Sequence, residues 1–418
     1  MSLPSRSATA PIAVTGCGIV SPIGNDWPSF DDSLFAGRSA LQARSLDLPG
    51  IELPPVPVAA ATFAADAESA SSRVPLDRGT AMALGAARDA AAAAQLEPGS
   101  YDAERLGIFW GSGMAGAATF EATCRSVYAD RRRMRPTSVL TTMPNAPAAE
   151  LALHFGARGA SLAYACACAS SAVAIGEAMR AIRAGWIDVA VAGGSESMLT
   201  PGVLASWQAM RVLAPIDGAG DPAGVAACCR PFAVDRCGFG LGEAAAALVL
   251  ESVDHARRRG VAASARLVGY ASNCDGLHLT RPDAAGQTRA MTAALVDAGL
   301  APADIGYLNA HGTATIAGDA AEADSIARVF GAGVPVSSSK AIHGHLLGAG
   351  GAVELLAALR ALAAQRLPPT ANVDRVDPAF VIDLVVGAAR AVSGLRCAMS
   401  NSFAFGGTNA VLIASLAD

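Results

Sequence analysis

One stretch of the chain joins a short apolar run to a long alanine-rich one: Ala163-Tyr164-Ala165-Cys166-Ala167-Cys168-Ala169-Ser170-Ser171. The change of pattern predicts a buried strand that ends near Ala165 and a helix that begins near Ser170. A cysteine at such a junction faces free backbone amides and the positive end of the helix dipole, which would lower the pKa of its thiol. The stretch therefore predicts a reactive cysteine, with a buried structural cysteine as the alternative.

The same alternation runs through the rest of the chain. Short apolar runs alternate with long alanine-rich stretches, which is typical of an α/β fold. We expect strands at 12–15, 106–110, 161–165, 188–192, 246–250, 266–270, 305–309, 334–337, 382–386, 397–400 and 410–413. We expect helices at 77–94, 171–184, 288–298, 320–329 and 346–364.

The 418 residues could form two or three average domains or one large duplicated unit. The charged stretch 251–260 is the best place to divide the chain, which gives an N-terminal half 1–255 and a C-terminal half 256–418. Strands and helices follow in a similar order on both sides, which indicates a structural duplication. Segments 40–75 and 213–229 are rich in small residues and proline, so we expect surface excursions there.

The composition excludes several classes of function. Hydrophobic residues make up 52% of the chain, and the net charge of −5 gives no electrostatic basis for binding nucleic acid. No window of about 18 residues is apolar without a charge, and no signal peptide is evident, so we expect no membrane span and a cytoplasmic protein. The nine cysteines are scattered and odd in number, which favours free thiols over a disulfide framework.

A second candidate site surrounds Lys340, the only lysine among 31 basic residues. Arginine is a wide planar fork and lysine a compact point charge, so a narrow buried position that accepts only an ammonium would explain this exception. His343 and His345 follow closely, and Glu354 lies on the next expected helix at a distance that allows it to pair with Lys340. Chance survival of one lysine is the alternative.

Two further motifs combine polar groups with glycine. In the stretch from Asn309 to Asp319, a strand delivers His311 into a turn, Thr313 and Thr315 can face one cleft, and Asp319 can cap the next helix. In Asn401-Ser402-Phe403-Ala404-Phe405-Gly406-Gly407-Thr408-Asn409, the paired glycines predict a tight loop with accessible amides, suited to an oxyanion hole. A satisfied core histidine and a plain glycine turn are the alternatives.

A metal site is a further alternative. Cys166, Cys168, His343 and His345 could offer four ligands, but structural zinc pairs usually have two or more residues between their ligands. We therefore expect no metal.

The motifs, taken in order, resemble one family. They read Ala-Cys-Ala-Ser-Ser, Asn-Ala-His-Gly-Thr-x-Thr-x-x-Gly-Asp, Ser-Lys-x-x-x-Gly-His-Leu-Leu-Gly-Ala and Asn-Ser-Phe-x-Phe-Gly-Gly-Thr-Asn. This order is similar to that of the type II group of β-ketoacyl-acyl carrier protein synthases, which are thiolase-fold condensing enzymes. The similarity covers essentially the whole chain. It implies a five-layered α-β-α-β-α fold made of two pseudo-symmetric halves.

The resemblance also implies a catalytic set. It places Cys168 as the nucleophile that takes an acyl group from the phosphopantetheine arm of an acyl carrier protein, with no bound cofactor. His311 and His345 would bind the thioester oxygen of malonyl-carrier protein while it loses carbon dioxide. Lys340, paired with Glu354, would set the local charge. The amides of Cys168 and Phe405 would form the oxyanion hole.

Other positions match residues that the family uses around the site. Phe405 resembles a gating phenylalanine, and Met114 matches a position at the acyl pocket. Substrate contacts are implied for Thr313, Thr315, Phe239 and Phe403. A basic cluster is a candidate docking face for an acidic carrier protein, with a solvated arginine surface as the alternative; it comprises Arg131, Arg132, Arg133, Arg135 and Arg211.

The chain departs from the family pattern at a few positions. Ala404 stands where glycine is usual, and alanine restricts positive φ, so the gate would move differently. His343, Ile316, Cys237 and Cys166 also replace the usual residues. These departures suit a specialised pathway that makes polyketides, polyenes or unusual acyl chains as well as ordinary fatty-acid elongation.

Two other functions are alternatives within this type of fold. A thiolase that acts on coenzyme A esters would carry a second cysteine where this chain has Phe-Gly-Gly-Thr-Asn. A chain-length-factor type of subunit would have lost the nucleophile, whereas Cys168, His311 and His345 are all present. The family implies a homodimer, or a heterodimer with a chain-length-factor-like subunit.

Overall fold

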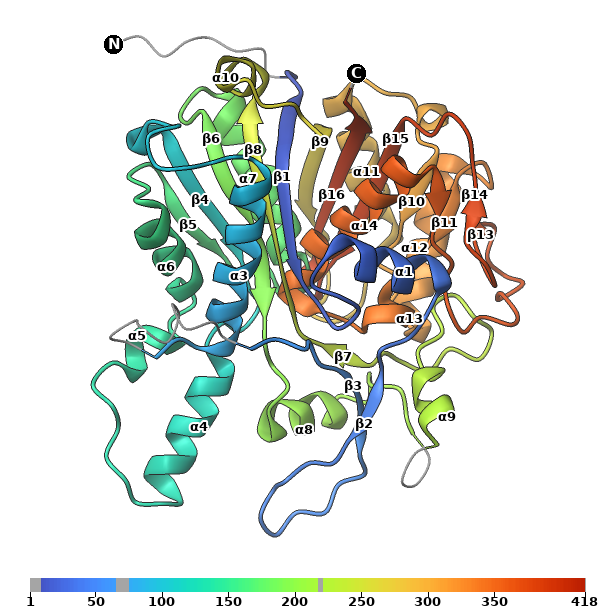
Figure 1. Ribbon diagram of the computed structural model, residues 1–418. Coiled ribbons are helices and arrows are strands. Elements are labelled where there is room, and N and C mark those ends of the chain that lie inside the picture. The colour runs from blue at the N-terminus through green and yellow to red at the C-terminus, as the bar shows by residue number, and fades with distance from the viewer. Residues whose placement is uncertain (1–8, 65–74, 217–220, 418) are drawn as a thin grey trace.

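The computed structural model describes residues 9–64, 75–216 and 221–417. Within these residues, eleven strands form one sheet in the order β13-β11-β10-β15-β16-β9-β1-β8-β6-β4-β5 (Figure 1). The N-terminal half contributes β1 (Ile12–Val20), β4 (Leu106–Gly111), β5 (Ser161–Tyr164), β6 (Val189–Glu196) and β8 (Ala244–Ser252). The C-terminal half contributes β9 (Ala265–Cys274), β10 (Tyr307–Asn309), β11 (Pro335–Ser337), β13 (Asp383–Leu384), β15 (Cys397–Phe403) and β16 (Thr408–Leu416).

The two halves repeat one strand topology. The five strands of the first half lie in the order first, fifth, fourth, second and third, and β9, β16, β15, β10 and β11 repeat that order. The pairings repeat as well: β1–β8 and β8–β6 are antiparallel while β6–β4 and β4–β5 are parallel, as in β9–β16, β16–β15, β15–β10 and β10–β11. The predicted duplication is therefore confirmed. The halves meet where β1 pairs with β9.

The strands of each half form a half-sheet, and the two half-sheets are joined at β1 and β9. The helices form three layers around them. α3 (Arg78–Ala93) and α6 (Ala146–Phe155) cover the outer face of the first half, and α11 (Ala284–Ala298) and α12 (Ile316–Phe330) cover that of the second. α7 (Ser170–Arg183) and α14 (Gly350–Ala364) pack together between the half-sheets and are buried on nearly all faces, as helices of a central layer must be. This arrangement is the predicted five-layered fold.

Small residues allow the layers to approach closely. A Cβ placed on Gly16 of β1 would lie 2.0 Å from the carbonyl oxygen of Ala90, so only glycine lets α3 pack directly on this strand. In the central layer, a Cβ on Gly351 would lie 2.7 Å from that of Ala172. The close contact of α7 with α14 therefore depends on Gly351, and it brings the starts of both helices together.

All eleven predicted strands are present, although several extend further than the sequence pattern indicated. The five predicted helices correspond to α3, α7, α11, α12 and α14. The sequence analysis did not predict the shorter helices α1 (Trp27–Ala36), α4 (Ala117–Tyr128), α5 (Ser138–Thr142), α6, α8 (Pro201–Ala209), α9 (Pro222–Ala226), α10 (Val253–Arg259) and α13 (Lys340–His343).

The two expected surface excursions are partly internal. β2 (Gln42–Arg44) and β3 (Val56–Ala59) form a small sheet with β7 (Leu241–Gly242), and β3 is buried along its whole length. Leu213, Ala214, Val225 and Cys229 are buried too. The expectation of surface segments at 40–75 and 213–229 is therefore wrong for these residues, because they pack against α8; residues 65–74 and 217–220 lie outside the described residues.

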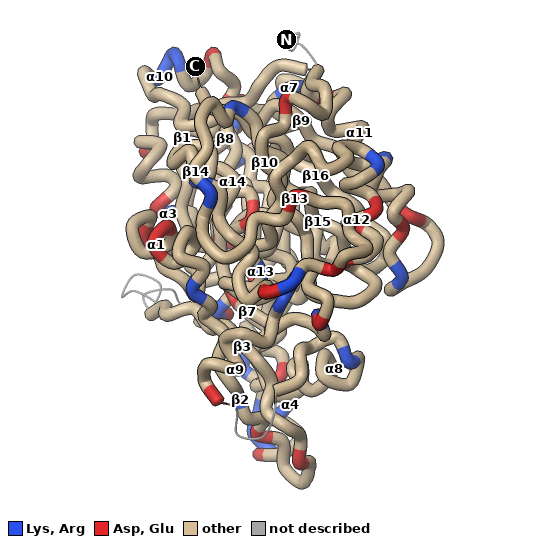
Figure 2. Tube along the Cα trace, turned by 90° about the vertical axis from the view of Figure 1, so that its right-hand side faces the viewer, with Lys and Arg blue, Asp and Glu red and all other residues tan. Residues whose placement is uncertain are grey.

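The charged residues, the most apolar helix and the cysteines can be compared with what the composition predicted. Basic and acidic residues are interspersed along the trace in Figure 2. One helical stretch, Leu347–Ala364, is long and apolar enough to cross a membrane, but 83% of it is buried inside the protein as part of the central layer. All nine cysteines are free thiols.

Candidate active site

Cys168 lies in a 3-10 turn, Ala167–Ala169, between β5 and α7. Its side chain is buried, with 6% exposed. Ala167 has a φ of 47°, which is uncommon for a residue with a Cβ, and Ser170 Oγ closes the turn by accepting from the amide of Cys166 at 2.9 Å. The turn therefore holds Cys168 at the start of the helix, as the sequence predicted.

The electrostatics of the thiol differ from the prediction. Burial raises the pKa of Cys168 to about 11, although the Lys340 ammonium and the backbone amides of Phe405 and Cys168 act in the opposite direction. The expected net lowering by the helix dipole is wrong for this structure, because desolvation penalises the thiolate more strongly than these groups favour it. The two amides nonetheless donate toward the sulfur, so they lie beside any acyl group that the sulfur carries. The oxyanion hole that they would form stays a prediction.

His345 faces the sulfur, with its Nε2 atom 3.2 Å from Cys168 Sγ. The amide of Leu347 donates to its Nδ1 atom at 3.2 Å, so in the neutral ring the proton resides on Nε2. Burial, and then the Lys340 charge, hold the pKa of His345 well below its usual value. The imidazole is therefore a neutral N–H donor directed at the nucleophile.

His311 is oriented in the same way by a different group. Its Nδ1 atom lies 3.3 Å from the Nζ of Lys340, which can only donate, so Nε2 again carries the proton. Burial and the same ammonium hold the pKa of His311 well below its usual value. The ring centroids of His311 and His345 lie 5.4 Å apart, and a nitrogen of each ring lies within 4.8 Å of Cys168 Sγ, so both imidazoles flank the thiol.

Lys340 is fully buried and donates to Glu354 Oε1, so the predicted pair is present. Burial raises the pKa of Glu354 to about 7, against the effect of the neighbouring ammonium. A lysine fits here because Nζ must reach both the carboxylate and the His311 ring inside the core. A planar guanidinium could not take this place without moving the packing around it.

Glu322 is a site residue that the sequence analysis missed. It lies on α12 and lines the cavity that leads to Cys168. It accepts from the amides of His311 at 2.8 Å and Gly312 at 2.6 Å. It therefore clamps the turn that carries His311. The helix itself is capped by Thr315, whose Oγ1 accepts from the amide of Gly318, and not by Asp319 as expected. Asp319 is buried and accepts from the amide of Phe232 instead.

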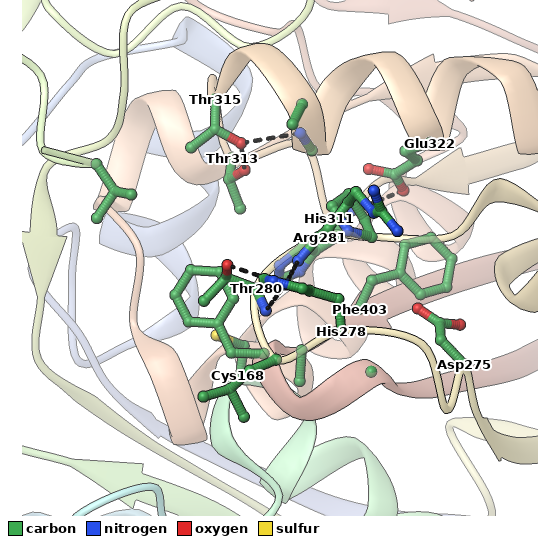
Figure 3. A pocket seen from close by; sticks show the side chains of 18 of the residues that line it. Cys168, Asp275, His278, Thr280, Arg281, His311, Thr313, Thr315, Glu322 and Phe403 are labelled. Atoms are coloured by element: carbon green, nitrogen blue, oxygen red, sulfur yellow. Dashed lines mark hydrogen bonds between the residues drawn. The ribbon is translucent and has the colours of Figure 1, made fainter. Parts of the chain in front are cut away.

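A cavity of about 250 Å³ leads to these groups. Thr313 and Thr315 lie on one side of it, with their hydroxyl oxygens 2.9 Å apart, and Cys168 lies at its base (Figure 3). Phe239, Phe403 and Phe405 line the cavity as well. The substrate contacts implied for Phe239 and Phe403, and the gating role implied for Phe405, stay predictions. A loop that the sequence analysis did not single out forms the rim; it contributes Asp275, His278, Leu279, Thr280, Arg281 and Pro282.

The loop that carries Phe405, residues 404–407, follows β15 and is called the gate loop after the role predicted for Phe405. Ala404 has a φ of −111°, an extended conformation in which alanine is unstrained. The positive φ angles fall on Gly406 at 84° and Gly407 at 80°. The amide of Gly406 donates to the carbonyl of Leu279 in the rim loop at 2.8 Å. The alanine at position 404 is therefore compatible with this state of the loop.

Other predicted residues lie outside the cavity. Met114 does not line it; its side chain is 49% exposed, and its amide donates to Glu196. Arg131, Arg132, Arg133 and Arg135 are exposed in the connection between α4 and α5. Arg211 is exposed as well and lines a second surface pocket together with Cys237. The roles proposed for these six residues remain predictions.

Two buried groups support the site from behind. Glu196, also missed from the sequence, accepts from the amides of Gly113, Met114 and Gly348, and burial raises its pKa to about 7. It links the Met114 loop to the start of α14. His343 donates from Nδ1 to the carbonyl of Gly344 and accepts from Ser339 Oγ, so it is a structural histidine of the opposite tautomer.

The four metal ligands considered from the sequence do not form one group: among the described residues, Cys168 and His345 lie together with His311, without Cys166 or His343. Cys168, His311 and His345 present one ligand atom each within 4.8 Å of one another. However, Leu347 and Lys340 place hydrogen-bond donors on both Nδ1 atoms, so each Nε2 already carries a proton. A metal ion would have to displace both protons beside a buried ammonium, which is unfavourable.

A buried thiol, two neutral imidazole donors and two converging amides, set at the meeting point of a duplicated α/β fold, define a thiolase-fold condensing enzyme. The family assignment follows from sequence. Residues 9–256 match the N-terminal domain of the β-ketoacyl synthases, and residues 264–374 match their C-terminal domain. The chain belongs to this family, as the motifs predicted.

Individual relatives span nearly the whole chain. Nodulation protein E of Rhizobium sp. (strain N33) is 37% identical over 96% of this chain and 98% of its own. 3-Oxoacyl-[acyl-carrier-protein] synthase 2 of Staphylococcus aureus (strain COL) is 35% identical over 96% of this chain and 97% of its own. Among solved structures, the ishigamide ketosynthase/chain length factor superposes with a TM-score of 0.88 and 27% identity, covering 98% of this chain and 100% of that one.

Proposed function

We propose that this protein is a β-ketoacyl-acyl carrier protein synthase that condenses an enzyme-bound acyl group with malonyl-acyl carrier protein. The observation that carries this proposal is the set of hydrogen-bond donors around Cys168. The N–H group of His345 and the amides of Phe405 and Cys168 are directed at the sulfur, and a ring nitrogen of His311 lies within 4.8 Å of it. Such a set stabilises negative charge on sulfur and on two different thioester oxygens.

In the first half-reaction, Cys168 Sγ forms a bond to the acyl carbonyl carbon. The bond from that carbon to the phosphopantetheine sulfur breaks, and the thiol proton leaves with the carrier protein. The amides of Phe405 and Cys168 hold the oxyanion of the intermediate. The raised pKa of Cys168 keeps the resting enzyme protonated, so charge develops on the sulfur only when a thioester is in place.

In the second half-reaction, malonyl-carrier protein occupies the cavity with its thioester oxygen between His311 and His345. The carboxylate leaves as carbon dioxide, and its bonding electrons form an enolate that the two N–H groups stabilise. The enolate carbon attacks the acyl-enzyme, which expels the Cys168 thiolate. One proton restores the thiol, and the β-ketoacyl chain leaves on the carrier protein.

The partner of this reaction is an acyl carrier protein. Thr313 and Thr315 face the cavity and offer hydroxyls to the amides of a phosphopantetheine arm. We infer that the exposed cluster of Arg131, Arg132, Arg133 and Arg135 receives the acidic carrier protein, with Arg211, at a second surface pocket, as a further contact. Charge reversal within this cluster would raise KM at low salt and leave acylation by small thioesters unchanged.

We propose a two-subunit assembly formed through β5. This strand ends the sheet, three of its four residues are exposed, and the side chain of Leu162 is 46% exposed. An unprotected edge strand pairs readily with another chain. The second chain is either another copy or a chain-length-factor-like subunit, and native mass spectrometry of the purified protein distinguishes the two. Cytoplasmic location is part of the same proposal.

The function is tested by intact-protein mass spectrometry after mixing with a panel of saturated and polyenoyl acyl-carrier proteins. An acyl adduct that is absent from Cys168→Ala supports the proposed nucleophile. The preferred acyl group separates fatty-acid elongation from a specialised polyketide or polyene pathway. A folded protein that takes no acyl group from any donor would contradict a stand-alone synthase and point to a missing subunit.

A further inference from the structure

Trp207, on α8, occupies a central place in a chain of aromatic contacts around the thiol. Its indole stacks on Phe405, with ring centroids 6.1 Å apart and an interplanar angle of 19°. On its other side it meets the edge of Phe239 at 5.9 Å. Phe239 in turn contacts His345, with ring centroids 5.0 Å apart. Trp207 thus connects the gate loop to the imidazole through ring contacts and acts on Cys168 only through Phe405 and His345.

The two residues at the ends of this contact chain both donate to Cys168. Phe405 does so through its backbone amide, and His345 through Nε2 at 3.2 Å. The gate loop is exposed at Gly406 and turns through two glycines of positive φ. The amides of Ala404, Gly406 and Gly407 donate to backbone carbonyls at 2.8–3.1 Å, so the backbone is held on both sides of Phe405. These bonds leave the Phe405 ring to side-chain packing, and the Trp207 stack supplies that packing.

We propose that Trp207 is a positioning residue that keeps the Phe405 amide and, through Phe239, the His345 ring directed at Cys168. The stack is present in the free enzyme. Only its consequence for catalysis rests on the proposed function. Entry of an acyl chain past Phe405 would have to separate this stack, so the same contact would set how readily the gate opens.

The test is the pH profile of Cys168 alkylation in the free protein, which needs neither substrate nor condensation. Iodoacetamide is applied across a pH series, and the labelled peptide is quantified by mass spectrometry so that the other eight cysteines do not interfere. The pKa of about 11 places the inflection above the working range, so the diagnostic is the alkylation rate between pH 7 and pH 10, which is proportional to the thiolate fraction. The smaller reagent methyl methanethiosulfonate is used in parallel, because a change in access to the cavity would alter the ratio of the two rates. The groups whose charge acts on this thiol, Lys340 and Glu354, are unchanged in every variant.

Trp207→Leu removes the stack and should lower the alkylation rate about tenfold at each pH from 7 to 10, which corresponds to a rise of about one unit in the pKa of the thiol. Trp207→Phe keeps an aromatic face and should stay within about threefold of the parent protein at neutral pH. Trp186→Leu is the matched control, because that indole is 67% exposed and lies away from the site. An unchanged profile for Trp207→Leu, or a failure of Trp207→Phe to restore it, would overturn the proposal.

A second variant guards against misfolding of the first. Phe405→Leu removes the opposite ring of the stack from another element and should lower the alkylation rate by a similar factor. The double variant should then add nothing, because both changes break one contact. Additive shifts in the pKa of the thiol would show that the two rings act independently and would also overturn the proposal. A protein that shows the coupling but accepts no acyl group would instead count against the proposed function alone.

Discussion

The junction from β5 into α7 and the junction from β11 into α14 occupy equivalent places in the two halves of the molecule. Each passes through a 3-10 turn into a buried helix. Each places a residue with a Cβ in the left-handed region, Ala167 with a φ of 47° and Leu347 with a φ of 49°. The backbone path has therefore been kept in both copies, including its strain.

The difference between the junctions lies in what precedes the turn. Only two residues separate β5 from the turn that carries Cys168. Between β11 and the second turn lie α13 and Gly344, and this longer connection supplies Lys340 and His345. The short junction thus presents a small nucleophile, and the long one presents a charge and a neutral hydrogen-bond donor. The contact of α7 with α14 at Gly351 brings the two products of the duplication into one site.

The largest effect is expected at the short junction. Cys168→Ala should lower condensation by about four orders of magnitude or more, because no other group can carry the acyl chain. Decarboxylation of malonyl-carrier protein should continue, since His311 and His345 remain in place. Both rates can be followed separately by mass spectrometry of the carrier protein. Cys166→Ala is the matched control and should keep both; an acyl adduct that survives Cys168→Ala would contradict the assignment.

The long junction should show the opposite pattern. His345→Ala removes one of two N–H donors to the enolate, so decarboxylation should fall by about 10²–10³-fold. Acyl transfer to Cys168 should fall less, because the amides of Phe405 and Cys168 still stabilise that intermediate. The exposed His154 provides a control substitution to alanine. Equal losses in the two half-reactions would show that the junctions are not functionally separate.

A smaller effect, on stability as well as rate, is expected at Lys340. Lys340→Met leaves the Glu354 carboxylate buried without its partner, so the free energy of unfolding should fall by about 3–5 kcal/mol. Lys340→Met combined with Glu354→Leu removes both charges and should regain much of that stability without regaining decarboxylation. Urea unfolding gives the stability and the carrier-protein assay gives the rate. A double variant as unstable as the single one would argue against the pair.

Sequence patterns predicted most of the fold and only part of the site, for a physical reason. Strands and central helices follow from local apolar periodicity, and Cys168, His311, Lys340 and His345 each stand in a local motif. Glu322 follows His311 by 11 residues, and no local pattern indicates that its carboxylate turns back to the His311 amide. Trp207 and Glu196 act through contacts that only the tertiary structure creates.

The thiol itself illustrates the same limit. From the sequence, a helix start is visible and desolvation is not, so the pKa of Cys168 was expected to fall. In the structure, layers from both halves exclude water around the sulfur, and burial decides the sign. Local electrostatics could be inferred from neighbouring residues, whereas the dielectric surroundings depend on the whole fold.

The two junctions should finally differ in their response to pH, which is the smallest effect and the finest test of the comparison. The pKa of Cys168 is raised to about 11, so its thiolate fraction, and with it alkylation of the free enzyme, should rise steadily from pH 7 to pH 10.

The pKa values of His311 and His345 are held well below 6.5, so both rings stay neutral as pH crosses that value. The rate of malonyl-carrier protein decarboxylation should therefore be constant between about pH 6 and 8. It should decline only in more acidic buffer, because the Leu347 amide and the Lys340 ammonium oppose protonation of the Nδ1 atoms. An inflection near pH 6.5 in that rate would mean that at least one of these histidines titrates like an exposed one. The long junction would then lack the dry, pre-oriented donors that distinguish it from the short one.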